Sequence, residues 1–169
     1  MSAADQAGET AGLRIRPSVR ALVVDELDRV LLMRFALGDR AIWATPGGGV
    51  EPGEDASAAL RRELDEELGL AVVDLGPRVW TRLLVTPLLD GAWDGQREDF
   101  WLVRTRAFAP APRLGWDGLR AEGVHEVRWW TPDELAAATD VTFAPRRLPA
   151  LLSRLLADGP PDEPLDTGE

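Results

Sequence analysis

Residues 45–70, TPGGGVEPGEDASAALRRELDEELGL, place the tightest constraints on how this chain can fold. They include three consecutive glycines, Gly47 to Gly49, and such a run marks a loop whose backbone can approach other groups closely because no Cβ intervenes. A helix is expected to follow, because Asp55 is suited to cap its start and Gly69 to end it. The segment therefore predicts a glycine loop that leads directly into an acidic helix.

This helix carries three glutamates within five positions: Glu63, Glu66 and Glu67. Like charges three or four residues apart on a helix repel each other by roughly 0.2 to 0.5 kcal/mol per pair. At ~100° per residue, Glu67 falls almost inside the apolar stripe centred on Leu64, and Glu63 falls at the rim of that stripe. The helix is therefore expected to carry unfavourable charge at the edge of the protein core.

Two acids on the helix have a base four residues earlier, as in ordinary surface ion pairs: Asp65 with Arg61, and Glu66 with Arg62. Glu63 and Glu67 have no base three or four positions away in the sequence. A carboxylate at the edge of the core is costly to desolvate without a partner. We therefore expect a group outside the helix to neutralise them, and a divalent cation suits this role because Mg²⁺ and Mn²⁺ prefer oxygen ligands.

The same residues carry a resemblance to a known family. Gly48, Glu54 and residues 62–70, RELDEELGL, fit the Nudix box, G-x5-E-x7-R-E-U-x-E-E-x-G-U, in which U is aliphatic. All seven fixed positions and both aliphatic positions are filled across 23 residues. The chain therefore resembles the Nudix hydrolase family, including its MutT-like members, and the likeness extends more weakly over residues 17–157.

The resemblance implies an α/β protein with the Nudix fold, an α/β/α sandwich with a mixed sheet. It also implies hydrolysis of the pyrophosphate bond of a nucleoside diphosphate linked to another moiety, with Mg²⁺ or Mn²⁺ as cofactor. Carried over position by position, it assigns metal binding to Glu63, Glu66, Glu67 and the carbonyl of Gly47. Arg62 would orient Glu63, and Glu54 would brace the loop, so the catalytic set is Glu63, Arg62, Glu66 and Glu54.

Carboxylates outside the box are further candidates, because several members of the family add one to the metal site. Glu98 lies just before a predicted strand, and Glu122 lies in a predicted loop. Glu126 is a third candidate, ranked after these two. For each of these residues the alternative is an exposed acid without a role in the site. The proton from the attacking water would go to a glutamate of the box or to an acid of another loop.

Substrate-binding candidates come from the predicted strands. Arg20, Arg34 and Arg82 could face substrate phosphates, although we expect at least two of the three to point outward into solvent. Trp130 could stack on a base, but Trp129 and Trp130 alternate sides of a strand, so one of them is expected in the core. Arg34, Arg82 and Trp130 are the candidates that we retain.

The substrate is less well specified than the reaction. The marker for diadenosine polyphosphates is a tyrosine, and the chain has none. Pro87, seventeen residues after Leu70, favours ADP-ribose or another nucleoside diphosphate sugar. One alternative is a house-cleaning nucleoside triphosphate pyrophosphatase. Another is a non-catalytic nucleotide-binding regulatory module, although the intact box favours an enzyme.

The rest of the chain predicts one domain over residues 13–157, between a disordered tail at 1–12 and a disordered acidic tail at 158–169. Predicted strands are a hairpin from Ser18 that turns at Asp25–Asp28, and segments 79–85, 99–108 and 126–130. Residues 41–54 read as a loop. Helices are predicted from Thr131, with a capping box to Glu134, and over residues 147–159. Strands interleaved with helices indicate a mixed sheet covered by helices.

Charge and hydropathy limit the partners. The net charge of −10 arises mostly in the two tails, whose removal leaves about −3, and this acidity argues against a long nucleic-acid partner. No apolar run approaches ~18 residues and no signal segment is evident, so we expect a cytoplasmic protein without a membrane partner. A small nucleotide is the expected partner, and the sequence does not decide between a monomer and a homodimer.

Overall fold

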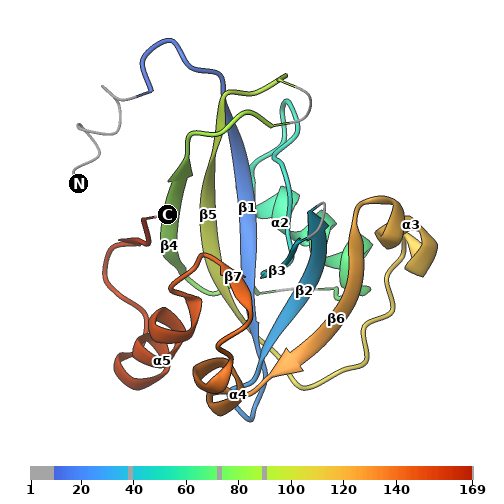
Figure 1. Cartoon of the computed structure of the whole chain (residues 1–169), viewed down its shortest axis with the longest axis vertical. Helices are drawn as coiled ribbons and strands as arrows, with labels where there is room; N and C mark the ends of the chain where they lie inside the picture. Colours follow the sequence, from blue (N-terminus) through green and yellow to red (C-terminus); the bar gives the residue numbers. More distant parts are fainter. Residues whose placement is uncertain (1–9, 38–39, 72–73, 89–90, 169) are drawn as a thin grey trace.

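The computed structural model describes residues 10–37, 40–71, 74–88 and 91–168 (Figure 1). Its strands are β1 (Ile15–Val24), β2 (Val30–Leu37), β3 (Arg40–Ala44), β4 (Arg78–Leu84), β5 (Gly95–Arg104), β6 (Val124–Trp130), β7 (Thr142–Ala144) and β8 (Leu165–Asp166). Its helices are α2 (Ala56–Leu68), α3 (Gly115–Ala121), α4 (Pro132–Ala137) and α5 (Leu148–Asp158). No helix in these described ranges is long and apolar enough to cross a membrane.

The strands form one mixed sheet in the order β7-β3-β2-β1-β5-β4-β8, and β6 pairs with β2 outside this path. β1 runs parallel to β5 along all ten of its residues, whereas β2 is antiparallel to β3 and to β6. The mixed sheet predicted from the sequence is confirmed, as are the predicted hairpin and the strands over 79–85, 99–108 and 126–130, with shifts of a few residues at their ends.

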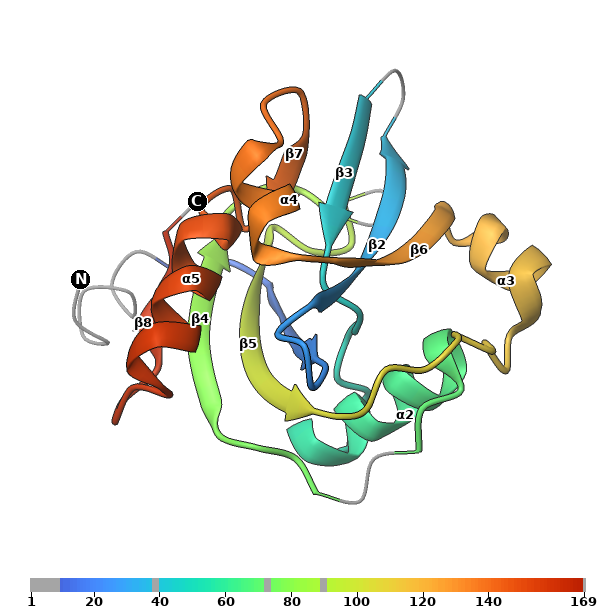
Figure 2. The ribbon, with the colours of Figure 1, turned by 90° about the horizontal axis from the view of Figure 1, so that it is seen from below.

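Helices cover both faces of the sheet, which confirms the α/β/α arrangement (Figure 2). Alternate residues of β1 point to opposite sides: Val19, Ala21 and Val23 pack in the cluster that includes the leucines of α2. Leu22 and Val24 pack in the other cluster, which includes the leucines of α5. Because both faces of β1 are covered, this strand lies at the centre of the molecule.

The glycine loop follows the edge of β1 in place of a neighbouring strand. The N–H of Val19 donates to the carbonyl of Gly48 at 2.9 Å, and the N–H of Ala21 donates to Pro46 at 2.9 Å. Among the described residues, β1 pairs with β2 at Val24 and Val30, where the hairpin turns. The loop is therefore held by backbone hydrogen bonds to the central strand.

Two unpredicted strands alter the organisation around this loop. Residues 41–54 were expected to be a loop throughout, but β3 occupies Arg40–Ala44, because its Ile42 and Trp43 pair with β2. The short strand β7 then pairs with β3 in parallel. Helix α3 was also not predicted, whereas the capping box between Thr131 and Glu134 at the start of α4 is confirmed.

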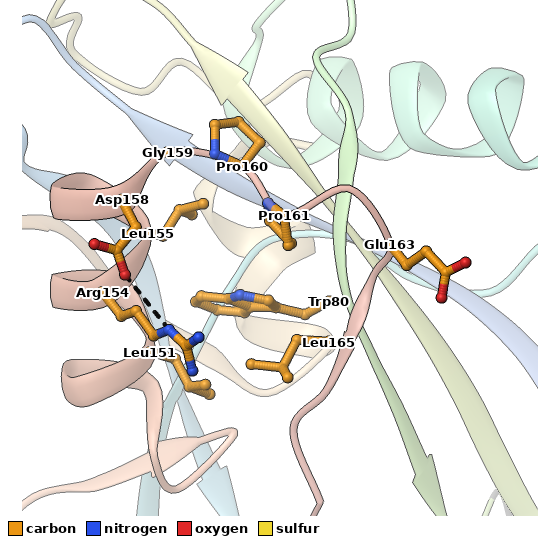
Figure 3. Close-up of a pocket in the computed structure, with 10 residues that line it drawn as sticks. All are labelled: Trp80, Leu151, Arg154, Leu155, Asp158, Gly159, Pro160, Pro161, Glu163 and Leu165. Atoms are coloured by element: carbon orange, nitrogen blue, oxygen red, sulfur yellow. Dashed lines mark ion pairs between the residues drawn. The ribbon is translucent and has the colours of Figure 1, made fainter. Parts of the chain in front are cut away.

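The acidic tail requires a correction. Residues 158–169 were predicted to be disordered, but Asp158 ends α5 and β8 pairs with β4. Thr167 is buried, and its N–H donates to the carbonyl of Thr81 at 2.9 Å. The segment packs over Trp80 beside α5 (Figure 3). The predicted N-terminal tail lies outside the described residues except for 10–12, which form a turn, and residue 169 also lies outside them.

Candidate metal and substrate site

Helix α2 forms where its caps predict. The side chain of Asp55 accepts hydrogen bonds from the N–H groups of Ser57 and Ala58, both at 2.9 Å. At the other end, Gly69 adopts a left-handed conformation with φ 66° and donates its N–H to Asp65. Both predicted caps are confirmed. They fix the ends of the helix and hence the direction in which each of its glutamates points.

Glu67 is a buried carboxylate, as its position on the helix predicted. It is 4% exposed, and it accepts a hydrogen bond from the N–H of Gly47 at 2.8 Å. Burial raises the pKa of Glu67 to about 8; the bond from Gly47 opposes this rise, and the nearby charge of Glu63 adds to it. A cation placed beside Glu67 would therefore remove much of the cost of its charged form.

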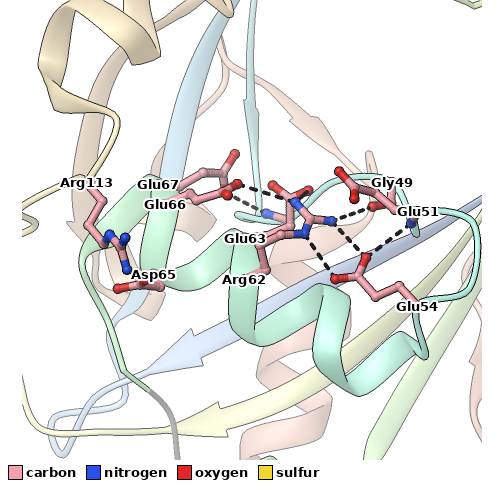
Figure 4. A network of polar contacts seen from close by, with 10 residues as sticks. Gly49, Glu51, Glu54, Arg62, Glu63, Asp65, Glu66, Glu67 and Arg113 are labelled. Carbon is pink, nitrogen blue, oxygen red and sulfur yellow. Dashed lines mark hydrogen bonds and ion pairs between the residues drawn. The ribbon is translucent and has the colours of Figure 1, made fainter.

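Arg62 stands at the centre of a polar network between α2 and the glycine loop (Figure 4). Its guanidinium donates to both carboxylate oxygens of Glu54, at 3.1 and 3.0 Å, and to Glu63 at 2.8 Å. It also donates to Glu66 at 3.3 Å and to the carbonyl of Gly49 at 3.0 Å. The hydrogen bonds that Arg62 donates to Glu54 and Glu63 hold the pKa of Arg62 well above its usual value, so the guanidinium is a permanent charge at this point.

This network corrects one sequence expectation. Glu63 was expected to have no partner on its own helix, but Arg62 pairs with it directly. Adjacent residues on a helix diverge, so only bases three or four positions away were considered. The arginine side chain is long enough to reach across that divergence. Asp65 pairs with Arg113, which lies in the segment before α3.

Glycines 47 and 48 leave space that a side chain would fill. A Cβ at Gly48 would collide with the carboxylate of Glu63. At Gly47, where φ is 128°, a Cβ would collide with the carbonyl of Val19. The loop can therefore lie this close to both α2 and β1 only with glycine at these two positions.

On the opposite face of the sheet, Arg20 reaches the same loop. Its Nη1 donates to the carbonyl of Gly47 at 2.5 Å, and its Nε donates to Glu98 at 2.8 Å. Glu98 is 1% exposed and also accepts from Nε of Arg82 at 2.6 Å. Burial would raise the pKa of Glu98, but the two arginines outweigh it and hold that pKa below its ordinary value. Glu98 is thus a charged carboxylate between two arginines.

A cavity of about 880 Å³ opens beside this arginine pair. Its walls come from β1 to β5, from β7 and from the loops that follow β4 and β7. Its charged lining residues are Arg20, Arg40, Arg82, Arg146 and Glu98. With four arginines and one glutamate, the cavity is suited to an anionic ligand.

The remaining predicted residues fall in different places. Arg82 lines the cavity but is buried, and Arg20 is only partly exposed, so the expectation that two of the three strand arginines point into solvent is wrong. Arg34 is half-buried in β2, opposite Glu126 of β6. Glu122 lies at the end of α3, is exposed, and acts electrostatically on Glu67.

Trp130 requires a correction as a base-stacking residue. It is 6% exposed and packs edge-to-face against Trp43, with ring centroids 5.0 Å apart, and against Phe143 at 5.5 Å. Its ring is therefore part of the core. Arg40 and Arg146 could not be predicted as cavity residues, because their proximity depends on the pairing of β3 with β7.

Within the described ranges, no three His, Cys, Asp or Glu side chains are grouped as a ready metal cage. Mg²⁺, however, usually takes one or two protein carboxylates and completes its octahedron with waters and substrate phosphates. The buried carboxylate of Glu67, the neighbouring Glu63 and the carbonyl of Gly47 supply only oxygen donors. This donor set fits a hard dication that is bound together with a phosphate ligand.

The sequence and the fold of this chain are similar to those of known proteins. Residues 14–151 match the NUDIX domain family. Nudix hydrolase 25 of Arabidopsis thaliana is 28% identical over 71% of this chain and 74% of its own length. An RNA pyrophosphohydrolase of Novosphingobium aromaticivorans is 32% identical over 74% of this chain and 83% of its own length. The solution structure of the E. coli ORF135 protein is similar in fold, with a TM-score of 0.64 and 24% identity over 90% of this chain and 98% of that one.

Proposed function

The chain belongs to the NUDIX family and is a hydrolase of pyrophosphate bonds, and from this premise we propose that it hydrolyses a nucleoside diphosphate linked to another moiety. Members of the family typically use a divalent metal. In this proposal Mg²⁺ or Mn²⁺ is held at the junction of α2 and the glycine loop. ADP-ribose or another nucleoside diphosphate sugar is the favoured substrate.

The observation that carries the proposal is the contact between Glu67 and the glycine loop. A buried carboxylate with a pKa of about 8 destabilises the fold when it is charged, unless a cation compensates. Glu67 lies beside Glu63 and accepts the N–H of Gly47, so a dication could share both carboxylates and the carbonyl of Gly47. Glu66, at the outer side of the network, would supply a further oxygen.

In this proposal, each residue of the site has a separate role. Arg62 holds Glu63 and Glu66 in position, and Glu54 fixes Arg62 from the loop side, where its carboxylate also accepts the N–H of Glu51. When bound, the metal would screen the phosphate charge and acidify a water. The proton from that water would go to a glutamate of α2 or to an acid of another segment, and Glu122, whose charge acts on Glu67, is one such acid.

The cavity would receive the part of the substrate beyond the scissile bond. Arg20 and Arg82 line its interior, and their charges are only partly offset by Glu98, so phosphate oxygens are favoured there. Its volume of about 880 Å³ is in the range of ligand pockets in proteins. Positioning and charge neutralisation are the main requirements for transfer at phosphorus.

A nucleoside 5′-triphosphate, free or at the end of an RNA chain, is a second candidate. Arg40 and Arg146 are exposed at the cavity, and neither makes an ion pair with another described residue. These two further guanidinium groups would suit a longer phosphate chain. One relative with 32% identity is named an RNA pyrophosphohydrolase, which is consistent with this alternative.

A substrate panel tests the proposal. Purified protein with Mg²⁺ or Mn²⁺ is incubated with ADP-ribose, UDP-glucose, nucleoside triphosphates and a 5′-triphosphorylated oligoribonucleotide, and products are separated by ion-exchange chromatography. Release of a nucleoside monophosphate from a diphosphate sugar supports the favoured substrate. Release of pyrophosphate from triphosphates alone supports the second candidate. Nucleotide binding without turnover of any compound would contradict an enzyme and indicate a regulatory module.

Matched variants of α2 test the residues. Glu63→Gln and Glu67→Gln keep the shape of each side chain but remove its charge, so turnover should fall by about 10² or more. Asp65→Asn on the same helix removes an acid that pairs with Arg113, away from the glycine loop, and should keep near wild-type turnover. Near wild-type turnover in Glu63→Gln or Glu67→Gln would refute the assignment of that residue.

A further inference from the structure

Arg20 contacts both parts of the site, although it lies on the face of the sheet opposite to α2. Its guanidinium lines the cavity, and the same group donates to the carbonyl of Gly47 at 2.5 Å. Its neighbours Val19 and Ala21 face α2, and the glycine loop follows the edge of β1 between these two residues. Arg20 therefore reaches the loop from the cavity side.

The position of this cation conflicts with a dication at the proposed site. The carbonyl of Gly47 is an expected metal ligand, and a guanidinium already donates to it. Burial lowers the pKa of Arg20, but Glu98 and, less strongly, the nearby charges of Glu67 and Glu63 outweigh burial and raise that pKa. A permanent positive charge thus occupies the carbonyl that a metal would use and lies near the two carboxylates.

Arg20 also fixes Glu98, a carboxylate that the sequence indicated as a metal ligand. Glu98 accepts from Nε of Arg20 and from Arg82, and Gln96 donates to it at 3.0 Å. Both oxygens of Glu98 therefore have arginine partners. Arg20 is placed between this carboxylate and the carbonyl of Gly47, so it separates Glu98 from the metal-binding oxygens.

We propose that Arg20 is a positioning residue that competes with the dication for the carbonyl of Gly47, keeps Glu98 out of the metal site, and thereby lowers the intrinsic affinity for metal. This inference rests on the metal site of the proposed function. Its basis is the pair of contacts that Arg20 makes, one to the loop and one to Glu98. Like charges a few ångströms apart repel strongly even when they are partly screened.

Arg82 provides a matched control. Like Arg20, it forms an ion pair with Glu98, lines the cavity and lies in a strand of the same sheet. Among the described residues, Arg82 makes its polar contacts with Glu98 and none with the glycine loop. Arg20→Met and Arg82→Met each remove one arginine and leave Glu98 with the other. A difference between them in metal binding therefore reports the contact with Gly47.

Metal affinity is measured without substrate, by following free Mn²⁺ with electron paramagnetic resonance during titration. Arg20→Met should bind Mn²⁺ about tenfold more tightly than the wild type or better, whereas Arg82→Met should stay within about threefold. Arg20→Lys, which keeps the charge, should also stay close to the wild type. Unchanged or weaker binding by Arg20→Met overturns the inference, and so does an equal gain in Arg82→Met.

A wild-type measurement covers the case in which Arg20→Met does not fold. The Nε–H resonance of Arg20 in ¹⁵N-labelled protein, assigned by its absence from Arg20→Lys, should shift when diamagnetic Mg²⁺ is added. A resonance that does not move at saturating Mg²⁺ overturns the inference. If the wild type binds no Mn²⁺ or Mg²⁺ at all, the metal site of the proposed function fails, which distinguishes the two failures.

Discussion

The carboxylate of Glu67 accepts a hydrogen bond from the backbone N–H of Gly47, twenty residues earlier in the chain, at a distance of 2.8 Å. This contact joins the last turn of α2 to the glycine loop. On its other side, the loop is bound to β1 by the hydrogen bond from Val19 to Gly48. The loop is thus held between a helix and the central strand, which fixes the oxygens that would face a metal.

The space between Gly48 and Glu63 leads to the first prediction. A Cβ at Gly48 would collide with the carboxylate of Glu63, so Gly48→Ala should displace that carboxylate while the fold survives. We expect turnover to fall by about 10², because small displacements of a catalytic group have large effects. Stability should drop by about 1 to 3 kcal/mol, as for other overpacked sites. Steady-state kinetics and urea denaturation measure the two effects.

Gly53→Ala is the control for this prediction. Gly53 lies in the same loop with φ 83°, and apart from its two chain neighbours no described residue has an atom within 4 Å of the position of its Cβ. The substitution should cost about 1 to 2 kcal/mol of stability through backbone strain and leave turnover nearly unchanged. Equal losses of turnover in both variants would contradict a role for the contact at Gly48.

The fork geometry of Arg62 gives the second prediction. Its guanidinium donates to Glu54, Glu63 and Glu66 at once, which a lysine ammonium cannot reproduce. Arg62→Lys should therefore lower kcat by about 10-fold to 10²-fold with little change in KM, since it disturbs the orientation of the carboxylates rather than the cavity. Arg61→Lys, one residue earlier, should keep kcat. A kcat near that of the wild type in Arg62→Lys would show that the network is not needed.

Local signals predicted helix α2 well. Asp55 and Gly69 act within a few residues of the helix ends, so their roles follow from the chain alone. The burial of Glu67 follows from its angle relative to the leucines, which is also a local property. The fold class and the box helix were therefore accessible from the sequence.

Contacts that depend on strand pairing were not accessible. Glu98 meets Arg20 and Arg82 only because β5 lies between β1 and β4 in the sheet, and the sequence does not give that order. Trp130 becomes a core residue through Trp43 of β3, a strand that glycine and proline content concealed. The burial of Arg82 and Trp130 depends on these partners across the sheet, so neither could be predicted from the sequence.

The turn between β1 and β2 gives a prediction about pH. Asp25 is fully buried and accepts hydrogen bonds from the N–H of Leu27 at 3.0 Å and from the N–H and Nε of Arg29 at 2.8 and 2.7 Å. Burial alone would raise the pKa of Asp25, but these bonds outweigh it and hold the pKa below its ordinary value of 3.8. Since the folded pKa lies below the unfolded one, the stabilisation is complete above about pH 4 and is lost as the pH falls through the folded value.

Asp25→Asn should therefore lower the free energy of unfolding by about 2 to 3 kcal/mol at pH 7, because it removes charge-assisted bonds. The difference from the wild type should shrink below about pH 4. Asp28→Asn in the same turn is the control, since the Asp28 pair with Arg104 is exposed and worth at most about 1 kcal/mol. Urea titrations at pH 3 and pH 7 measure the free energy of unfolding of both variants. If Asp25→Asn is as much less stable than the wild type at pH 3 as at pH 7, the stabilising role of the charged Asp25 is contradicted.

The C-terminal strand gives the last prediction. Deletion of residues 160–169 removes β8 and uncovers Trp80, which is 2% exposed beside Leu165 and Pro161. The loss of this cover should cost about 1 to 3 kcal/mol of stability, as for exposure of one large apolar side chain. Turnover should persist, because β8 pairs with the outer edge of β4 and not with the glycine loop. Deletion of only residues 168–169 keeps Thr167 and its bond to Thr81, so the melting temperature should stay close to that of the full chain. An equal loss of stability in both truncations would show that β8 does not stabilise this edge.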